Sequence, residues 1–232
     1  MIPARHEQFT LNLGHRPATG RDDFLVAPSN QDAVAWIDLW PSWPAPAFIL
    51  YGPAACGKSH LAAVWQARTQ ATAIKAEELA THEADTLFQS GDHFMIDPVD
   101  QWIGDRAAET TLFHLYNLAK EHQRTILMTS RVAPIRLDFV IPDLASRLRA
   151  APNVAIQSPD EVLLGAVLVK MFADRQIQIG EDVLNYILPR MERSFAAARD
   201  LVEKADHLAL AEKRPVSLPL VRHVLMTQTG GE

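Results

Sequence analysis

The chain has 232 residues, enough for one medium-sized domain and a smaller one. Its 28 acidic residues outnumber the 22 Lys and Arg residues and give a net charge of -6, which argues against a broad nucleic-acid-binding surface and predicts no direct sequence-specific DNA binding. No apolar stretch approaches the ~20 residues of a membrane span, the N-terminus lacks the apolar core of a secretory signal, and the single cysteine excludes an internal disulfide. We therefore expect a cytoplasmic protein that does not associate with a membrane.

The first part of the chain alternates short apolar runs with helix-like stretches. Residues 1–23 are polar and mixed, and are predicted to form an extended leader. A helix is predicted to begin near Ser29, whose side chain can cap it. Apolar runs then predict buried strands of a parallel sheet at residues 48–51, 73–75, 93–96, 125–128 and 154–156. Because strands alternate with helices, residues 24–158 are predicted to form an α/β domain.

The pattern changes at Ser158, and no strand pattern follows it. The run Ser158-Pro159-Asp160-Glu161 is a capping box with proline at the first helical position, so a helix is predicted to begin there. A second amphipathic helix is predicted after Ser194, which is placed to cap it, and a short third helix ends the chain. Residues 159–232 are therefore predicted to form a small all-α domain.

A phosphate-binding motif lies between the first predicted strand and a helix-like stretch. The motif G-x-x-x-x-G-K-[ST] is formed by Gly52, Pro53, Ala54, Ala55, Cys56, Gly57, Lys58 and Ser59. The glycines let the loop bend so that its backbone N–H groups point at phosphate oxygens at a helix N-terminus. Lys58 is expected to reach the β- and γ-phosphates, and the Ser59 hydroxyl to ligate Mg²⁺. The motif predicts binding of ADP or ATP.

A carboxylate for the magnesium ion is predicted at Asp97, because it follows the strand at 93–96 and so reaches the sheet edge where α/β proteins bind ligands. In relatives that hydrolyse ATP, a second acid usually follows this carboxylate directly and activates water. Here Pro98 occupies that position and has no acid or base function. Asp100 follows nearby, but we interpret it as a structural carboxylate. We therefore expect secure nucleotide binding and slow intrinsic hydrolysis.

The order of these features, from about residue 24 to residue 228, resembles the AAA+ ATPases, and more narrowly the DnaA-related regulators of the Hda type. The resemblance implies a parallel-sheet core with helices on both faces, followed by a small helical lid. Residues 24–30, with Leu25 and Val26, resemble the segment that wraps the adenine. Thr129 lies at the position called sensor 1, which senses the γ-phosphate or the attacking water. Residues 141–148 resemble the arginine-finger box, with Arg147 in the finger position.

The lid departs from the family pattern at the second phosphate sensor. Residues 193–199 resemble the sensor-2 helix, but Ala196 stands where the family has its arginine. Arg193 and Arg199 lie one turn to either side, so either arginine is a candidate for contact with the nucleotide. We expect Arg193 to contribute to the nucleotide site.

The leader resembles the short peptide through which Hda proteins bind the DNA polymerase sliding clamp. Gln8 would anchor such a peptide by hydrogen bonds, while Phe9, Leu11 and Leu13 would lie on one side of an extended segment and fill pockets on the clamp. The resemblance therefore implies two partners, the clamp and DnaA, together with a possible homo-oligomer.

These features favour a regulator that docks on the clamp and presents Arg147 to ATP held by DnaA, which would switch initiation off. Two alternatives stay open. An ATP-hydrolysing helicase loader of the same superfamily would show substantial turnover and would bind a helicase. A nucleotide-stabilised scaffold would tether partners to the clamp without catalysis and would not need Arg147. Independently of these hypotheses, Arg147 could be a surface arginine in a salt bridge.

Overall fold

The sheet forms the centre of the N-terminal half of the protein. The computed structural model describes residues 25–75 and 77–229, and within them five parallel strands form one sheet in the order β2-β3-β4-β1-β5. The strands are β1 (Ala47–Tyr51), β2 (Thr72–Ile74), β3 (His93–Ile96), β4 (Thr125–Ser130) and β5 (Asn153–Ala155). Because every pair is parallel, the carboxyl ends of the strands meet at one edge, where ligands of open α/β sheets bind.

Helices cover both faces of this sheet. Around the sheet lie α1 (Gln31–Asp38), α2 (Lys58–Thr69), α3 (Glu78–Thr81), α4 (Ala84–Gln89), α5 (Arg106–Glu121), a 3-10 turn (Pro134–Arg136) and α6 (Pro142–Ala150). The C-terminal part contains α7 (Glu161–Ala173), α8 (Glu181–Ile187), α9 (Phe195–Glu212) and α10 (Leu218–Thr229).

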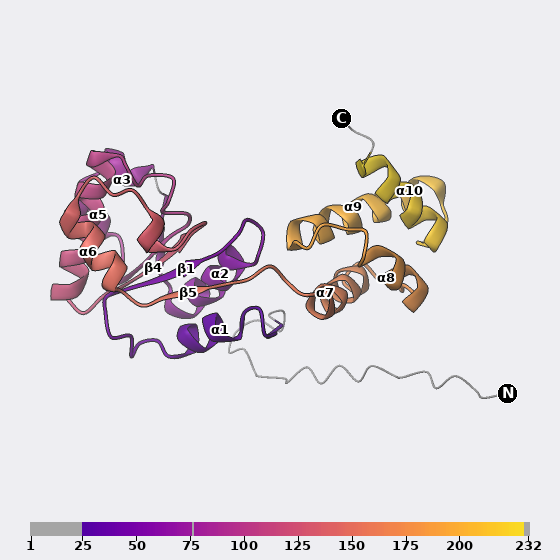
Figure 1. Cartoon of the computed structure of the whole chain (residues 1–232), viewed down its shortest axis with the longest axis horizontal. Helices are drawn as coiled ribbons and strands as arrows, with labels where there is room; N and C mark the ends of the chain where they lie inside the picture. Colours follow the sequence, from indigo (N-terminus) through magenta and orange to yellow (C-terminus); the bar gives the residue numbers. More distant parts are fainter. Residues whose placement is uncertain (1–24, 76, 230–232) are drawn as a thin grey trace.

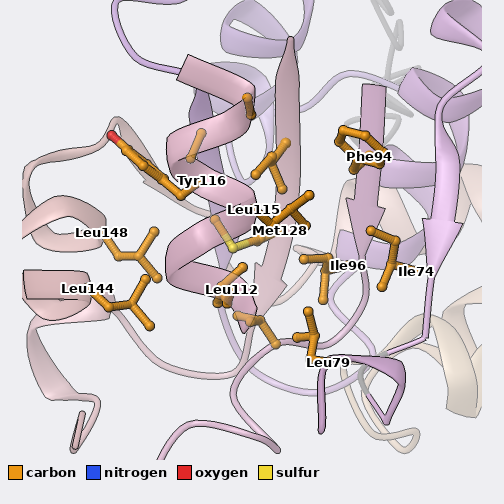
Figure 2. Packing of buried hydrophobic residues seen from close by; sticks show 14 of the residues in the cluster. Ile74, Leu79, Phe94, Ile96, Leu112, Leu115, Tyr116, Met128, Leu144 and Leu148 are labelled. Atoms are coloured by element: carbon orange, nitrogen blue, oxygen red, sulfur yellow. The ribbon is translucent and has the colours of Figure 1, made fainter. Parts of the chain in front are cut away.

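Successive side chains of a β-strand point to opposite faces of the sheet, so the buried residues form two hydrophobic cores, one on each face. Phe48 and Leu50 of β1 pack with α1 and α2 on one face, whereas Ile49 packs with α5 on the other. Figure 2 shows this second core, where side chains of β2, β3 and β4 meet Leu112 and Leu115 of α5. Helices α3 to α6 therefore lie on the opposite face of the sheet from the P-loop helix α2.

The C-terminal helices have a hydrophobic core of their own. Its fully buried members include Leu164 and Phe172 of α7, Ile187 of α8, Leu201 of α9 and Leu220 of α10. Figure 1 shows these helices as a separate body, reached by a single stretch of chain after β5. The predicted α/β core with helices on both faces and an all-α C-terminal part is confirmed. Among the described residues no helix is both long and apolar enough to cross a membrane.

Local details correct two predicted helix starts. Asn30, not Ser29, is the N-cap residue of α1. Helix α7 begins at Glu161 with Asp160 as its cap, rather than directly after Ser158, because the Asp160 carboxylate accepts the N–H of Leu163 at 2.7 Å. The last helix, α10, is longer than expected. The prediction for Ser194 is confirmed, since its hydroxyl oxygen caps α9.

Candidate phosphate-binding site

The loop between β1 and α2 approaches two other segments so closely that glycine is required at two positions. A Cβ atom added to Gly52 would lie 2.1 Å from the carbonyl oxygen of Ile156, just after β5. Gly57 has a φ of +104°, which side chains rarely adopt, and a Cβ there would lie 3.1 Å from the ring of Phe195 in the lid. The loop is thus packed between the end of β5 and the first residue of α9.

The Lys58 side chain is buried within this loop. Its ammonium donates to the carbonyl oxygens of Gly52 at 2.8 Å and Pro53 at 2.7 Å, and its third close neighbour is Cys56 Sγ at 3.8 Å. Burial raises the pKa of the Cys56 thiol, and the Lys58 charge opposes this shift. The thiol therefore stays neutral at physiological pH, and the charge of Lys58 remains available for an anion.

Asp97 and Thr129 meet at the carboxyl edge of the sheet. Ile96 pairs with Met128 in the β3–β4 ladder, so the next residues along the two strands are brought together. The Thr129 hydroxyl, which is fully buried, donates to Asp97 Oδ1. The sequence predicted both residues for the same site, and the fold brings them into direct contact.

Asp100 is tied to the backbone beyond β4. Its Oδ1 accepts the N–H of Arg131 at 3.0 Å, and the N–H of Val99 donates to the carbonyl of Thr129 at 2.9 Å. These two bonds fasten the turn after Asp97 to the end of β4. Pro98, between Asp97 and Val99, offers no group that can transfer a proton.

Residues 25–30 form a turn that is closed by the side chain of Asn30. The Asn30 amide donates to the carbonyl of Leu25 at 3.0 Å, and its carbonyl oxygen accepts the N–H of Ala27 at 2.9 Å, so Val26 lies within this turn. The carbonyl of Ser29 accepts the N–H of Gln157 at 3.0 Å. Gln157 directly follows Ile156, which contacts Gly52, so this turn and the P-loop flank the same stretch of chain.

The lid touches the P-loop through the N-terminus of α9. The N–H of Phe195 donates to the carbonyl of Ala55 at 3.2 Å, while the Phe195 ring faces Gly57. Arg193, two residues earlier, forms an ion pair with Glu161 of α7, and the two side chains are 61% and 50% exposed. The structure therefore brings Phe195 to the loop but holds Arg193 within the lid. Arg199 is exposed on α9.

Arg147 lies on α6 and packs against aromatic rings of α5. Its guanidinium carbon lies 4.5 Å from the ring centre of Phe113 and 5.6 Å from that of Tyr116. Burial raises the pKa of Tyr116, and the positive charge of Arg147 opposes this shift. Within residues 25–75 and 77–229, no carboxylate pairs with Arg147, so the ion-paired surface arginine considered above is not what the structure shows. Gln8, Phe9, Leu11 and Leu13 lie outside the described residues.

Comparisons with known proteins agree on one relationship. Residues 165–225 match the family described as the Hda lid domain. The chromosomal replication initiator DnaA of Clavibacter sepedonicus is 25% identical over 230 residues, covering 90% of this chain and 48% of that protein, and DnaA of Clavibacter michiganensis subsp. michiganensis gives the same values. The chain is similar to DnaA over most of its length and to Hda in its lid. It spans about half the length of the curated relatives it matches.

Solved structures confirm the AAA+ fold. Domain III of the Thermotoga maritima replication initiation protein DnaA matches with a TM-score of 0.78 and 21% identity, covering 88% of this chain and 94% of that one. AMPPCP-bound DnaA from Aquifex aeolicus gives a TM-score of 0.71 at 18% identity, over 89% of this chain and 68% of that one. A RuvB chain from Thermotoga maritima has the same fold, with a TM-score of 0.68 and 14% identity. The match covers 86% of this chain and 68% of that one.

Two residues that shape the site, Asn30 and Phe195, were not predicted from the sequence. Asn30 was detectable in principle, because asparagine side chains often replace backbone groups in turns. Phe195 carried no such signal, since an aromatic residue at the start of a helix is compatible with any packing partner.

Proposed function

We propose that the chain binds an adenine nucleotide, ADP or ATP, at the loop from Gly52 to Ser59. The support is the buried ammonium of Lys58, which lies at the centre of a loop whose backbone turns at Gly57 into the N-terminus of α2. A bound phosphate would exchange for the loop carbonyls as the partner of Lys58. Leu25 and Val26 would contact the adenine, because their turn flanks the same chain segment as the P-loop.

Mg²⁺ fits the residues present. Among the described residues no group of three or more His, Cys, Asp or Glu side chains could hold a metal ion. Magnesium at nucleotides needs only one or two protein oxygens beside phosphates and waters. We assign these to Ser59 and Asp97. When bound, the ion would neutralise charge on the phosphates. Thr129 would orient the Asp97 carboxylate through its hydroxyl and would serve as sensor 1.

Intrinsic hydrolysis is proposed to be slow. Pro98 has no acid or base function, and one oxygen of Asp100 is committed to the backbone of Arg131. Arg193 is paired with Glu161 within the lid, so we propose that Arg193 adds little phosphate contact in this arrangement. For Arg193 to act as sensor 2, this exposed ion pair would have to open, which costs little because exposed pairs contribute only about 0–1 kcal/mol.

We further propose that the protein is a cytoplasmic negative regulator of replication initiation that stimulates ATP hydrolysis by DnaA. The observation that carries this proposal is the position of Arg147. It is half-buried on α6, lies on the opposite sheet face from α2, and has an aromatic partner instead of a carboxylate. These features support our proposal that Arg147 acts on a neighbour's nucleotide. An arginine finger supplied in trans can raise a hydrolysis rate by ~10³–10⁵-fold. The leader, through Gln8, Phe9, Leu11 and Leu13, would bind the sliding clamp. A homo-oligomer using the same α6 face is compatible with this arrangement.

The test is a reconstituted assay with clamp-loaded DNA and ATP-loaded DnaA. Gln8→Ala combined with Leu11→Ala should abolish clamp binding and leave binding of ADP intact. Arg147→Ala should bind both the clamp and ADP but no longer stimulate hydrolysis by DnaA. Full activity of Arg147→Ala would support the scaffold, and rapid turnover without DnaA would support the helicase loader. Full activity of the leader variant would remove the clamp assignment.

A further inference from the structure

Glu109 is a fully buried carboxylate that the proposed reaction does not use. It lies on α5, on the face of the sheet opposite the P-loop helix. Its Oε1 accepts the N–H groups of Gly104 at 2.8 Å and Val140 at 3.0 Å, and its Oε2 accepts the N–H of Ile141 at 2.7 Å. Three backbone donors around one carboxylate satisfy it without any basic side chain.

Two of these donors open the helix that carries Arg147. Ile141 is the N-cap residue of α6, and its own side chain cannot cap the helix. The first N–H groups of any helix lack intrahelical partners, and a negative charge near them is favourable. Glu109 therefore accepts from α5 the N–H of the N-cap residue and of the residue before it, and so holds the backbone where α6 begins.

The other end of α6 is held by the same face of α5. Phe113 and Tyr116 follow Glu109 by four and seven residues, so the three side chains share one helix face. The rings of Phe113 and Tyr116 contact the guanidinium of Arg147. Figure 2 shows Tyr116 extending from α5 on the side of Leu144 and Leu148 of α6. We call Glu109, Phe113 and Tyr116 the α5 cradle.

We propose that the α5 cradle presets Arg147, with Glu109 as a positioning residue that fixes the start of α6 and the two rings as a shelf that holds the guanidinium. The consequence for a partner's ATP rests on the function proposed above. An arginine side chain has many rotamers, and a displacement of ~1 Å at a reacting centre can lower a rate by about 10²-fold. Because the α5 cradle already holds the guanidinium in one position, Arg147 does not have to sample other rotamers when the partner docks.

Variants of the cradle test the idea in the full-length chain. Glu109→Gln keeps the size of the side chain but offers one acceptor oxygen and one NH₂ group, so at least one N–H of the α6 start loses its acceptor. Phe113→Leu removes the ring under Arg147, and Phe113→Tyr keeps one. Glu121→Gln, at the exposed end of α5, makes the same charge change outside the cradle.

Both Glu109→Gln and Phe113→Leu should lower the maximal rate of stimulated hydrolysis by about tenfold or more, within the range expected for a misplaced catalytic group. The half-saturating concentration of DnaA and the affinity for ADP should stay within about twofold of wild type. Phe113→Tyr and Glu121→Gln should behave as wild type. An unchanged maximal rate in both cradle variants would overturn the proposal. If Glu109→Gln does not fold, Phe113→Leu decides alone.

Two measurements do not depend on DnaA. Hydrogen exchange at the Val140 and Ile141 amides should accelerate in Glu109→Gln and not in Glu121→Gln. The Tyr116 phenol, followed by NMR of ¹³C-labelled tyrosine, should titrate at higher pH in Arg147→Gln, and likewise in Glu109→Gln if Arg147 has left the shelf. If wild type fails to stimulate DnaA, the proposed function fails, and these two readouts still decide whether α5 holds Arg147. Unchanged exchange and an unchanged titration would overturn the proposal.

Discussion

Phe195 of the lid and Gly57 of the P-loop are direct neighbours: a Cβ on Gly57 would lie 3.1 Å from Phe195 Cε2, and the N–H of Phe195 donates to the carbonyl of Ala55 in the same loop. The Phe195 ring and one backbone hydrogen bond thus join the helical body to the proposed phosphate-binding loop. Any change of the loop on nucleotide binding is expected to move the first turn of α9.

Gly57→Ala should lower the affinity for ADP by at least tenfold. The added methyl group meets the Phe195 ring, and alanine is strained at a φ of +104°. Calorimetry of the single variant and of Gly57→Ala with Phe195→Ala separates the two causes, because only the steric one is relieved in the double variant. Partial recovery is expected. Wild-type affinity in Gly57→Ala would show that the loop does not need this backbone conformation.

Lys58→Ala should abolish detectable binding of ADP, since it removes the buried charge at the centre of the loop. Lys120→Ala, on the exposed side of α5, is the matched control and should bind ADP as wild type does. Isothermal titration calorimetry in the presence of Mg²⁺ checks both. Equal affinities of the Lys58 variant and wild type would contradict the nucleotide site.

Intrinsic ATP turnover should stay below about 1 s⁻¹, the lower end of ordinary enzyme rates. Asp100→Asn should leave it unchanged, because the asparagine oxygen can still accept the N–H of Arg131. Steady-state phosphate release measures both. Faster turnover that disappears in Asp100→Asn would identify Asp100 as the base that Pro98 cannot provide.

His93 should make the protein less stable in mild acid. Burial lowers the pKa of His93 below its ordinary value of 6.5, more than Asp92 raises it, and Thr125 and the Trp40 ring contact it. As pH falls, His93 therefore takes up a proton in the unfolded chain before it does so in the folded protein. The contribution of neutral His93 to the free energy of unfolding is complete above about pH 6.5 and is lost as pH falls below that value.

Urea unfolding at pH 7.5 and pH 5.5 checks this prediction. The loss of unfolding free energy between the two pH values should be smaller in His93→Gln than in wild type. His207→Gln, at an exposed position on α9, should keep the wild-type loss. Equal losses in all three proteins would show that His93 does not sense pH.

Most of the fold could be predicted from local features of the sequence. Apolar runs predicted the strands, and Ser194 predicted the start of α9, because caps and strand burial are decided by neighbouring residues. The short helices α3 and α4 and the lid helix α8 were not predicted, since short helices depend on tertiary packing more than on local sequence.

The site could be predicted only as far as its motifs extend. The P-loop and Asp97 follow from motifs at strand ends, and Thr129 from the family resemblance. The hydrogen bonds from Val140 and Ile141 to Glu109 and the pairing of Arg193 with Glu161 join residues 31 to 32 positions apart. Such contacts depend on how elements pack, and a single sequence carries no periodic pattern for them.

Single-turnover hydrolysis of labelled ATP preloaded on DnaA tests the central claim most directly. With clamp-loaded DNA present, wild-type protein should accelerate the reaction, and Arg147→Ala should lose at least ~10³-fold of that acceleration, as expected for a finger acting in trans. Arg149→Ala, on the same helix with its guanidinium over Phe139, is the control and should retain it. Full acceleration by Arg147→Ala would contradict the account.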